Sequence, residues 1–271
     1  MGRLGDHPKS TNEIGLIEDK GMRPLPRRWI IRFLSLAGLP MIERSGSSGA
    51  WAAENKRKLK VVVTGGHPGD PEYGCGGTIA RYTDLGHEVT LLYLNRGEKE
   101  CPESETSVGR GVRVAEARKA CSILKSRAVF ASQCDGHAVV DAAAYDEFRK
   151  LLEGEKPDVV FTHWPIDNHR DHRAISMLVY DAWLRGDKKF ALYFYEVSDG
   201  EDTLMFHPTE YVDISATNER KRAACYAHAS QAPERFYALQ DQVTRFRGLE
   251  FGTSRAEAFV RHARSIGGLL P

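Results

Sequence analysis

The chain has 271 residues, with 38 lysines and arginines against 37 aspartates and glutamates, so its formal net charge at pH 7 is only +1. This balance argues against a nucleic-acid partner, which needs a clearly basic surface. No uncharged apolar run approaches the ~18 to 20 residues that cross a bilayer, so we expect no integral membrane span in the mature chain. The 5 cysteines form no C-x-x-C pair, which argues against a thiolate metal site.

Residues 1–55 have the order of an export leader followed by a linker. Arg27 and Arg28 precede a short apolar stretch at 33–42, and small residues at 50–52 offer a cleavage site. This order resembles a twin-arginine signal peptide and predicts a periplasmic or extracellular protein. The alternative is an amphipathic or unstructured tail on a cytoplasmic enzyme.

Strands and helices alternate regularly along the rest of the chain. The expected strands are short, continuous apolar runs, as in sheets buried on both faces, and the expected helices have apolar residues at helical spacing. In chain order we expect strand 59–66, helix 74–86, strand 87–94, helix 110–125, strand 128–130, helix 142–154, strand 158–163, helix 171–185, strand 190–197 and strand 211–214. We expect the remainder of the chain to be mostly helical, with patterned segments at 216–228 and near 255–264. The alternation predicts a Rossmann-like, doubly wound α/β domain over residues 56–271, with a mostly parallel sheet and helices on both faces.

Histidines and acids cluster after two of the expected strands. His-Pro-Gly-Asp-Pro-Glu at 67–72 follows the first strand, and Asp-Asn-His-Arg-Asp-His at 167–172 follows strand 158–163. The carboxyl ends of parallel strands are where open α/β sheets bind their ligands. Two imidazoles and one carboxylate, with a position left open, match the ligand set of many hydrolytic zinc sites. We therefore predict a zinc site, although a single histidine at a strand end is more often structural.

Three glycines after the first cluster allow a different interpretation. Gly74, Gly76 and Gly77 are reminiscent of a nucleotide-binding loop, but they lack the G-x-G-x-x-G spacing at the turn. Histidines and acids also stand where a phosphate needs backbone amides and positive charge. We prefer close packing of a helix against the sheet as the reason for these glycines.

Together the two clusters resemble the LmbE-like, GlcNAc-phosphatidylinositol de-N-acetylase superfamily of zinc-dependent N-deacetylases. The family motif His-Pro-Asp-Asp-Glu is similar to residues 67–72, and the motif His-x-Asp-His matches residues 169–172. The resemblance implies one Zn²⁺ per chain, held by His67, Asp70 and His172. It also implies a metal-dependent amidohydrolase that removes an N-acyl group, N-acetyl above all, from a small amino sugar or glycoconjugate.

The same resemblance implies further roles. His169 would help to hold the oxyanion and protonate the leaving amine, and Asp171 would fix the tautomer of a neighbouring imidazole. Asp171 is also well placed as a first-turn acid of the helix that follows. Arg113 is similar to an arginine that contacts the substrate, and its alternative is an ordinary solvated or helix-pairing charge.

One departure from the family pattern concerns catalysis. The first aspartate of the family motif is the general base, and this sequence has Gly69 there, with Pro71 added before the glutamate. In one alignment Asp70 is the ligand and Glu72 reaches the water as base; in the other Asp70 is the base and Glu72 the ligand. We favour the first because the spacing from His67 to Asp70 is unchanged. The alternative function is a catalytically impaired metal-binding or sugar-binding member of the same fold.

Overall fold

The computed structural model describes residues 57–97 and 108–271. The predicted leader and linker over residues 1–55 lie outside the described residues. Within the described part of the chain, no helix is both long and apolar enough to cross a membrane.

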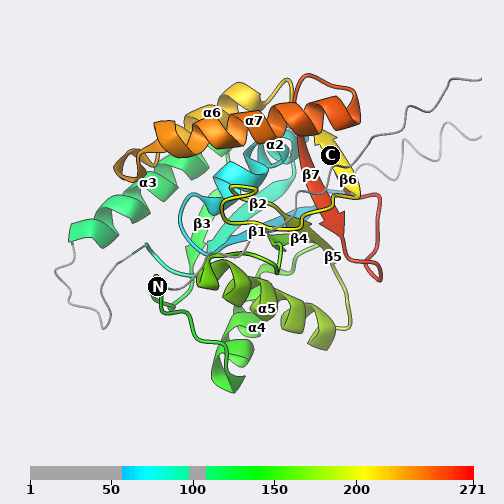
Figure 1. Cartoon of the computed structure of the whole chain (residues 1–271). Coiled ribbons are helices and arrows are strands. Elements are labelled where there is room, and N and C mark those ends of the chain that lie inside the picture. The colour runs from blue at the N-terminus through cyan, green and yellow to red at the C-terminus, as the bar shows by residue number, and fades with distance from the viewer. Residues whose placement is uncertain (1–56, 98–107) are drawn as a thin grey trace, which may run out of the picture. The chain divides into compact units, whose positions relative to one another are not determined.

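A mixed, mostly parallel sheet forms the centre of the structure (Figure 1). Its seven strands lie in the order β3-β2-β1-β4-β5-β7-β6. The first five in this order run parallel, while β7 is antiparallel to both β5 and β6. The strand bounds are β1 Lys60–Gly65, β2 Glu88–Tyr93, β3 Arg127–Phe130, β4 Val159–His163, β5 Ala191–Tyr195, β6 Glu210–Asp213 and β7 Ala256–Arg261. The predicted α/β fold class is confirmed.

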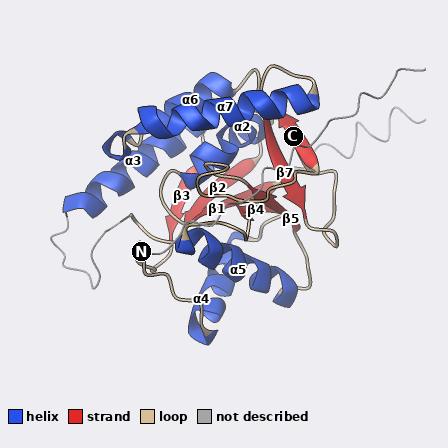
Figure 2. Cartoon of the chain, in the orientation of Figure 1, coloured by secondary structure: helices blue, strands red, loops and turns tan. Residues whose placement is uncertain are grey.

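Helices cover both faces of this sheet (Figure 2). One face carries α2 (Asp70–Asp84), α3 (Val108–Leu124), α6 (Asn218–Tyr226) and α7 (Pro233–Phe251), and the other carries α4 (Ala142–Glu155) and α5 (Arg170–Arg185). A short 3₁₀ turn, Ala229–Gln231, links α6 to α7. In β1, Val61 and Val63 belong to one apolar core and Val62 to the other. Alternate side chains thus enter different cores, which explains why the central strands are apolar throughout.

Two segments differ from the sequence-based expectation. Helix α2 begins at Asp70, so part of the predicted turn is its first turn: Gly69 precedes it with φ 118°, and Pro71 needs no backbone donor there. The helix predicted at 255–264 is wrong, because residues 256–261 form strand β7. Its partners β5 and β6 come from distant parts of the sequence, and a local pattern does not report such pairing.

The prediction that glycines allow close packing is confirmed. A Cβ at Gly74 would overlap the Tyr195 ring of β5, and one at Gly77 would lie 2.6 Å from Ile214 Cβ. Helix α2 therefore lies unusually close to β5 and the β6–α6 turn. This contact fixes the beginning of α2, where Asp70 stands, against the carboxyl end of the sheet.

Candidate metal centre

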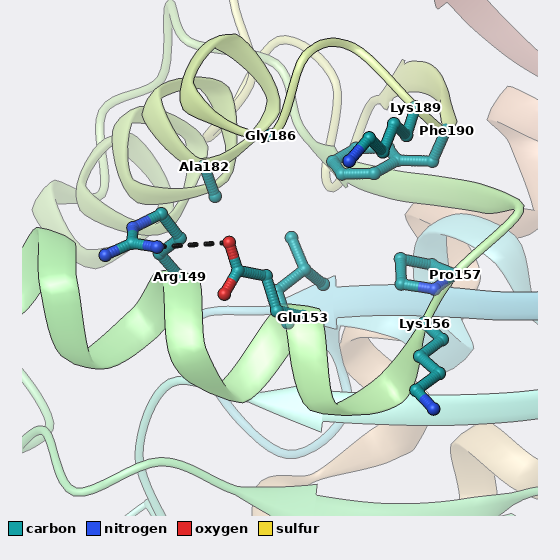
Figure 3. A pocket seen from close by; sticks show the side chains of 9 residues that line it. Arg149, Glu153, Lys156, Pro157, Ala182, Gly186, Lys189 and Phe190 are labelled. Carbon is teal, nitrogen blue, oxygen red and sulfur yellow. Dashed lines mark hydrogen bonds and ion pairs between the residues drawn. The ribbon is translucent and has the colours of Figure 1, made fainter.

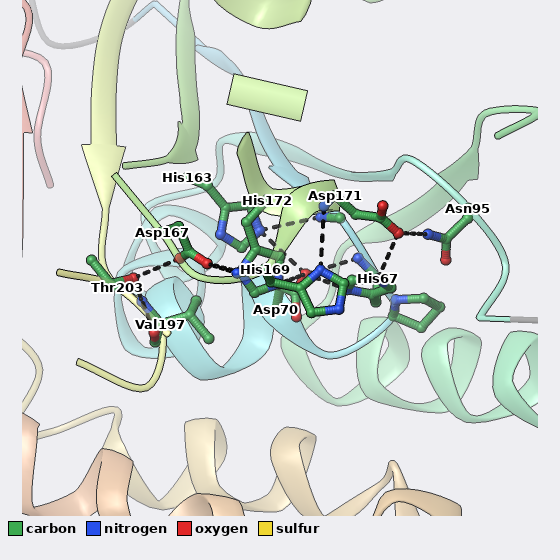
Figure 4. Close-up of polar contacts among 12 residues, drawn as sticks. His67, Asp70, Asn95, His163, Asp167, His169, Asp171, His172, Val197 and Thr203 are labelled. Atoms are coloured by element: carbon green, nitrogen blue, oxygen red, sulfur yellow. Dashed lines mark hydrogen bonds and ion pairs between the residues drawn. The ribbon is translucent and has the colours of Figure 1, made fainter. Parts of the chain in front are cut away.

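The three predicted metal ligands meet at the carboxyl ends of β1 and β4 (Figure 4). Asp70 Oδ2 lies 3.3 Å from His67 Nδ1 and 3.3 Å from His172 Nε2. His67 follows β1, Asp70 opens α2, and His172 lies in the first turn of α5. The described residues form three overlapping groups of possible ligands: His67 with His169 and His172, Asp70 with His163 and His172, and His67 with Asp135 and Asp171.

A second carboxylate lies behind each of the two ligand imidazoles. His67 Nε2 is 3.1 Å from Asp171 Oδ2, and His172 Nδ1 is 3.1 Å from Asp167 Oδ1. We assign the ring N–H of each histidine to the nitrogen that faces its carboxylate. Once a metal displaces the second ring proton, the other nitrogen of each ring presents its lone pair on the side of Asp70. Metal-binding histidines are commonly oriented in this way.

The donor set fits the implied zinc ion. Two imidazole nitrogens and one carboxylate oxygen are ligands that Zn²⁺ takes, and the group adjoins a cleft from which water and substrate can approach. His67 and His172 are buried, which shields the site from bulk water on the protein side.

The shifted pKa values of His172 and Asp70 also fit a site for a cation. Burial lowers the pKa of His172, but the Asp70 and Asp167 carboxylates outweigh it and bring this pKa to about 9. Burial raises the pKa of Asp70, yet His172 and His67 hold it well below its usual range. Carboxylate and imidazolium thus compensate each other in the metal-free cluster. A cation that displaces the imidazole protons supplies the same compensation.

His163 is a site residue that the sequence did not single out. It ends β4, is fully buried, and its Nε2 lies 3.2 Å from Asp70 Oδ2. Its ring stacks on His172 at 4.0 Å between centroids. Burial and the neighbouring His172 lower its pKa to about 4, so the imidazole is neutral. The same Nε2 also accepts a hydrogen bond from the Gly66 N–H at 3.2 Å. The sequence does offer one indication of this role, because His163 is the last residue of the strand that precedes the second cluster.

His169 stands at the N-cap of α5. Its Nδ1 accepts a hydrogen bond from the Asp171 backbone N–H at 3.3 Å. The ring proton therefore resides on Nε2, and burial, with the positive charges of His67 and His172, lowers the pKa of this imidazole. His169 is a neutral donor in the wall of the cleft.

Asp171 has the position that its predicted role requires. Its carboxylate is fully buried beside His67 and accepts further hydrogen bonds from Gly136 N–H at 2.7 Å and Asn95 Nδ2 at 3.4 Å. It also lies in the first turn of α5, as expected of a helix-start acid. Asp171 therefore stands where both of its predicted roles require it, beside a ligand imidazole and in the first turn of α5.

Arg113 reaches the cleft from α3. Its Nη2 donates to the Pro68 carbonyl at 2.9 Å, and its Nη1 lies 3.6 Å from Asp135 Oδ2. Asp135, on the loop after β3, also lies 3.1 Å from His67 Nε2. Asp135 lies outside any recognisable motif, so the sequence does not single it out. Together Arg113 and Asp135 present a donor and an acceptor on the cleft wall.

The structure places Glu72 away from the metal ligands. Its buried carboxylate accepts a hydrogen bond from Tyr93 Oη at 2.8 Å and lies 3.0 Å from His228 Nε2. Because α2 begins at Asp70, a residue two positions later points to another side of the helix. Glu72 does not line the cleft. Its role as base stays a prediction that these contacts do not support.

The cleft above the metal centre has a volume of about 380 Å³ and is bounded by α2, α5, the loop after β5 and the start of α7. Another pocket, of about 340 Å³, lies between α4 and α5 and is lined in part by Arg149, Lys156 and Phe190 (Figure 3). None of the predicted site residues lines that pocket. The cleft at the metal centre is therefore the candidate substrate site.

Known proteins resemble this chain in sequence and fold. Residues 62–183 match the family described as "PIG-L: GlcNAc-PI de-N-acetylase". The diacetylchitobiose deacetylase of Thermococcus kodakarensis is 27% identical over 226 residues, which cover 78% of this chain and 84% of that protein. The conserved protein TT1542 from Thermus thermophilus has a TM-score of 0.65 at 28% identity, covering 79% of this chain and 99% of that one.

A further solved structure supports the fold alone. The N,N'-diacetylchitobiose deacetylase from Pyrococcus horikoshii has a TM-score of 0.64 at 23% identity, over 76% of this chain and 85% of that one. The matched residues 62–183 cover most of β1 and α5 and all of α2 and β4, which are the elements that carry the candidate metal centre. This chain therefore contains a domain of the PIG-L (LmbE-like) family.

Proposed function

We propose that this protein is a zinc-dependent hydrolase that removes an N-acetyl group from an amino sugar or glycoconjugate. The observation that carries the proposal is the position of Asp70 Oδ2 at 3.3 Å from nitrogens of both His67 and His172. The relative named diacetylchitobiose deacetylase supports an N-acetylated sugar as substrate. The predicted leader supports the additional proposal that the enzyme acts outside the cytoplasm.

His67, Asp70 and His172 would hold the metal in this proposal. Zn²⁺ bound there supplies Lewis-acid polarisation of the acyl carbonyl and makes an attacking water easier to deprotonate. His169 Nε2–H donates to the carbonyl oxygen as negative charge develops on it. Asp171 and Asp167 keep the two ligand imidazoles in their orientation through the far ring nitrogens.

Arg113 and Asp135 would bind the sugar. The guanidinium offers N–H donors and the carboxylate offers acceptors, so the pair matches the alternating donor and acceptor character of sugar hydroxyls. Their salt bridge at 3.6 Å holds both groups on the same wall of the cleft. The acyl group then points toward the metal centre.

A catalytically impaired binding protein is the second candidate, and Gly69 is the observation that favours it. The purified full chain separates the two when bound zinc and acetate release from N-acetylglucosamine and diacetylchitobiose are both measured. We expect about one zinc per chain and acetate release in proportion to enzyme. Zinc binding without acetate release would select the second candidate.

Two variants test the ligand assignment in the same assay. Asp70→Ala should lose zinc and activity together because it removes a ligand. Glu72→Gln should retain zinc because its carboxylate contacts Tyr93 and His228 instead of the metal ligands. Full zinc in Asp70→Ala, or zinc loss only in Glu72→Gln, would assign the ligand role to Glu72.

A further inference from the structure

Gly69 leaves the proposed hydrolase without its usual base, so the carboxylates that line the cleft are the candidates to replace it. Besides Asp70 these are Asp135, Glu201 and Asp202. Asp135 is engaged by His67 and Arg113. Glu201 is exposed and lies 3.4 Å from Arg235 Nη2. These two carboxylates already have partners.

Asp202 differs from the other two. It is half-buried in the cleft wall, and no side chain or backbone group among the described residues donates a hydrogen bond to its carboxylate. No lysine or arginine side chain of residues 57–97 and 111–271 forms an ion pair with it. The Asp202 carboxylate therefore faces the cleft, where it can accept a hydrogen bond from a water molecule.

The backbone holds Asp202 beside the metal centre. Its carbonyl accepts a hydrogen bond at 2.8 Å from the N–H of Asn168, the residue before His169. Its own N–H donates to the Ser198 carbonyl at 2.9 Å. The next residue, Thr203, donates from Oγ1 to Asp167 Oδ2 at 3.1 Å. The loop is thus fastened to the segment that leads into His169 and His172.

The electrostatic surroundings favour a proton acceptor. Burial raises the pKa of Asp202; the positive charge of His172 lowers it, and the Asp167 and Asp70 carboxylates raise it again. Its charge therefore interacts with the residues of the metal centre. A carboxylate with a raised pKa accepts a proton more readily than an ordinary one, provided that it is ionised at the working pH.

We propose that Asp202 is the general base of the hydrolysis, in place of the carboxylate absent at Gly69; this inference rests on the proposed function. Water gives a proton to an Asp202 carboxylate oxygen while its oxygen bonds to the acyl carbon, and the carbonyl π electrons move to the carbonyl oxygen. When the oxyanion re-forms the C=O bond and the C–N bond breaks, the electron pair of that bond leaves with the amine nitrogen. The nitrogen takes the proton from Asp202 and not from His169. The products are the carboxylic acid and the amine, and Asp202 is ionised again.

The test compares the Asp202→Asn and Asp199→Asn variants of the full chain. Asn keeps the size of the side chain and removes its basicity, so kcat for diacetylchitobiose should fall about 100-fold or more in Asp202→Asn. Zinc per chain and the calorimetric Kd for mono-deacetylated chitobiose, the amine product, should stay within about twofold of wild type. Asp199→Asn, on the same loop but not lining the cleft, should keep its kcat.

The pH profile gives an independent readout. Wild-type kcat should fall as the pH drops through the pKa of Asp202, and the residual rate of Asp202→Asn should lack this acidic limb. A variant that keeps more than half of the wild-type kcat, or that loses zinc together with activity, would overturn the inference. A zinc-loaded wild type that releases no acetate contradicts the proposed function itself.

Discussion

At the scale of single residues, the metal centre depends on side chains that hold the ligand imidazoles from behind. Asp167 Oδ1 faces His172 Nδ1, while Asp167 Oδ2 accepts from Thr203 Oγ1 at 3.1 Å. The Thr203 hydroxyl also accepts from the Val197 N–H at 3.0 Å. The buried Thr203 hydroxyl thereby holds the Asp167 carboxylate in place, and Asp167 in turn orients the His172 imidazole.

We expect Thr203→Val to weaken zinc binding about tenfold, because removal of such supporting hydrogen bonds typically costs that much affinity. Valine keeps the shape of the side chain and leaves Asp167 Oδ2 without this donor. Chelator competition measures the change. Thr203→Ser retains the hydroxyl and serves as the matched control. Equal zinc affinity in the valine and serine variants would contradict the positioning role.

At the scale of elements, the site depends on how closely α2 packs against β5. Gly74 faces the Tyr195 ring, and the Tyr195 hydroxyl donates to the Thr64 carbonyl of β1 at 2.6 Å. The ring is therefore held from two sides and has little room to move. Any side chain at position 74 must push α2 away from the sheet, and Asp70 with it.

Gly74→Ala should therefore destabilise the protein by about 1–3 kcal/mol, as overpacking in a close-packed core does. Gly154→Ala is the matched control, because Gly154 is an exposed helical glycine of α4 with open space around its Cβ position. That change should stabilise the protein by about 0.5–1 kcal/mol. Denaturant unfolding measures both. Equal free energies of unfolding for the two variants would contradict the close approach of α2 to β5.

At the scale of the whole molecule, the buried charges of the metal centre couple stability to pH and zinc. The folded pKa of His172 is about 9, raised from an ordinary 6.5. A raised histidine pKa contributes stability that is fully present below the unfolded value and is lost as the pH rises through the folded value. The metal-free protein should therefore lose stability between about pH 6.5 and 9.

Thermal unfolding of the metal-free chain checks this coupling: its Tm should fall over that pH range. The loss should be smaller with zinc bound, because zinc takes the place of the protons, and zinc affinity should rise with pH for the same reason. His172→Asn lacks the titrating group and should show a flatter dependence in the metal-free state. A metal-free wild type with a constant Tm from about pH 6.5 to 9 would contradict the buried imidazolium.

The α/β alternation and the two clusters of histidines and acids can both be predicted from the local sequence. The central strands are apolar on both faces, and His67, Asp70 and His172 lie in short motifs at the ends of two strands. Both signals are local, so they can be read without knowing which segments meet.

The other groups at the site come together only when the chain folds. His163, Asp135 and Asp202 come from a strand end and two loops without a motif, and folding alone brings them around the same cluster and cleft. Glu72, adjacent in sequence, turns away because α2 begins at Asp70. Strand β7 likewise exists through its pairing with distant strands. Sequence patterns report neighbours along the chain, whereas a site and a sheet are made by neighbours in space.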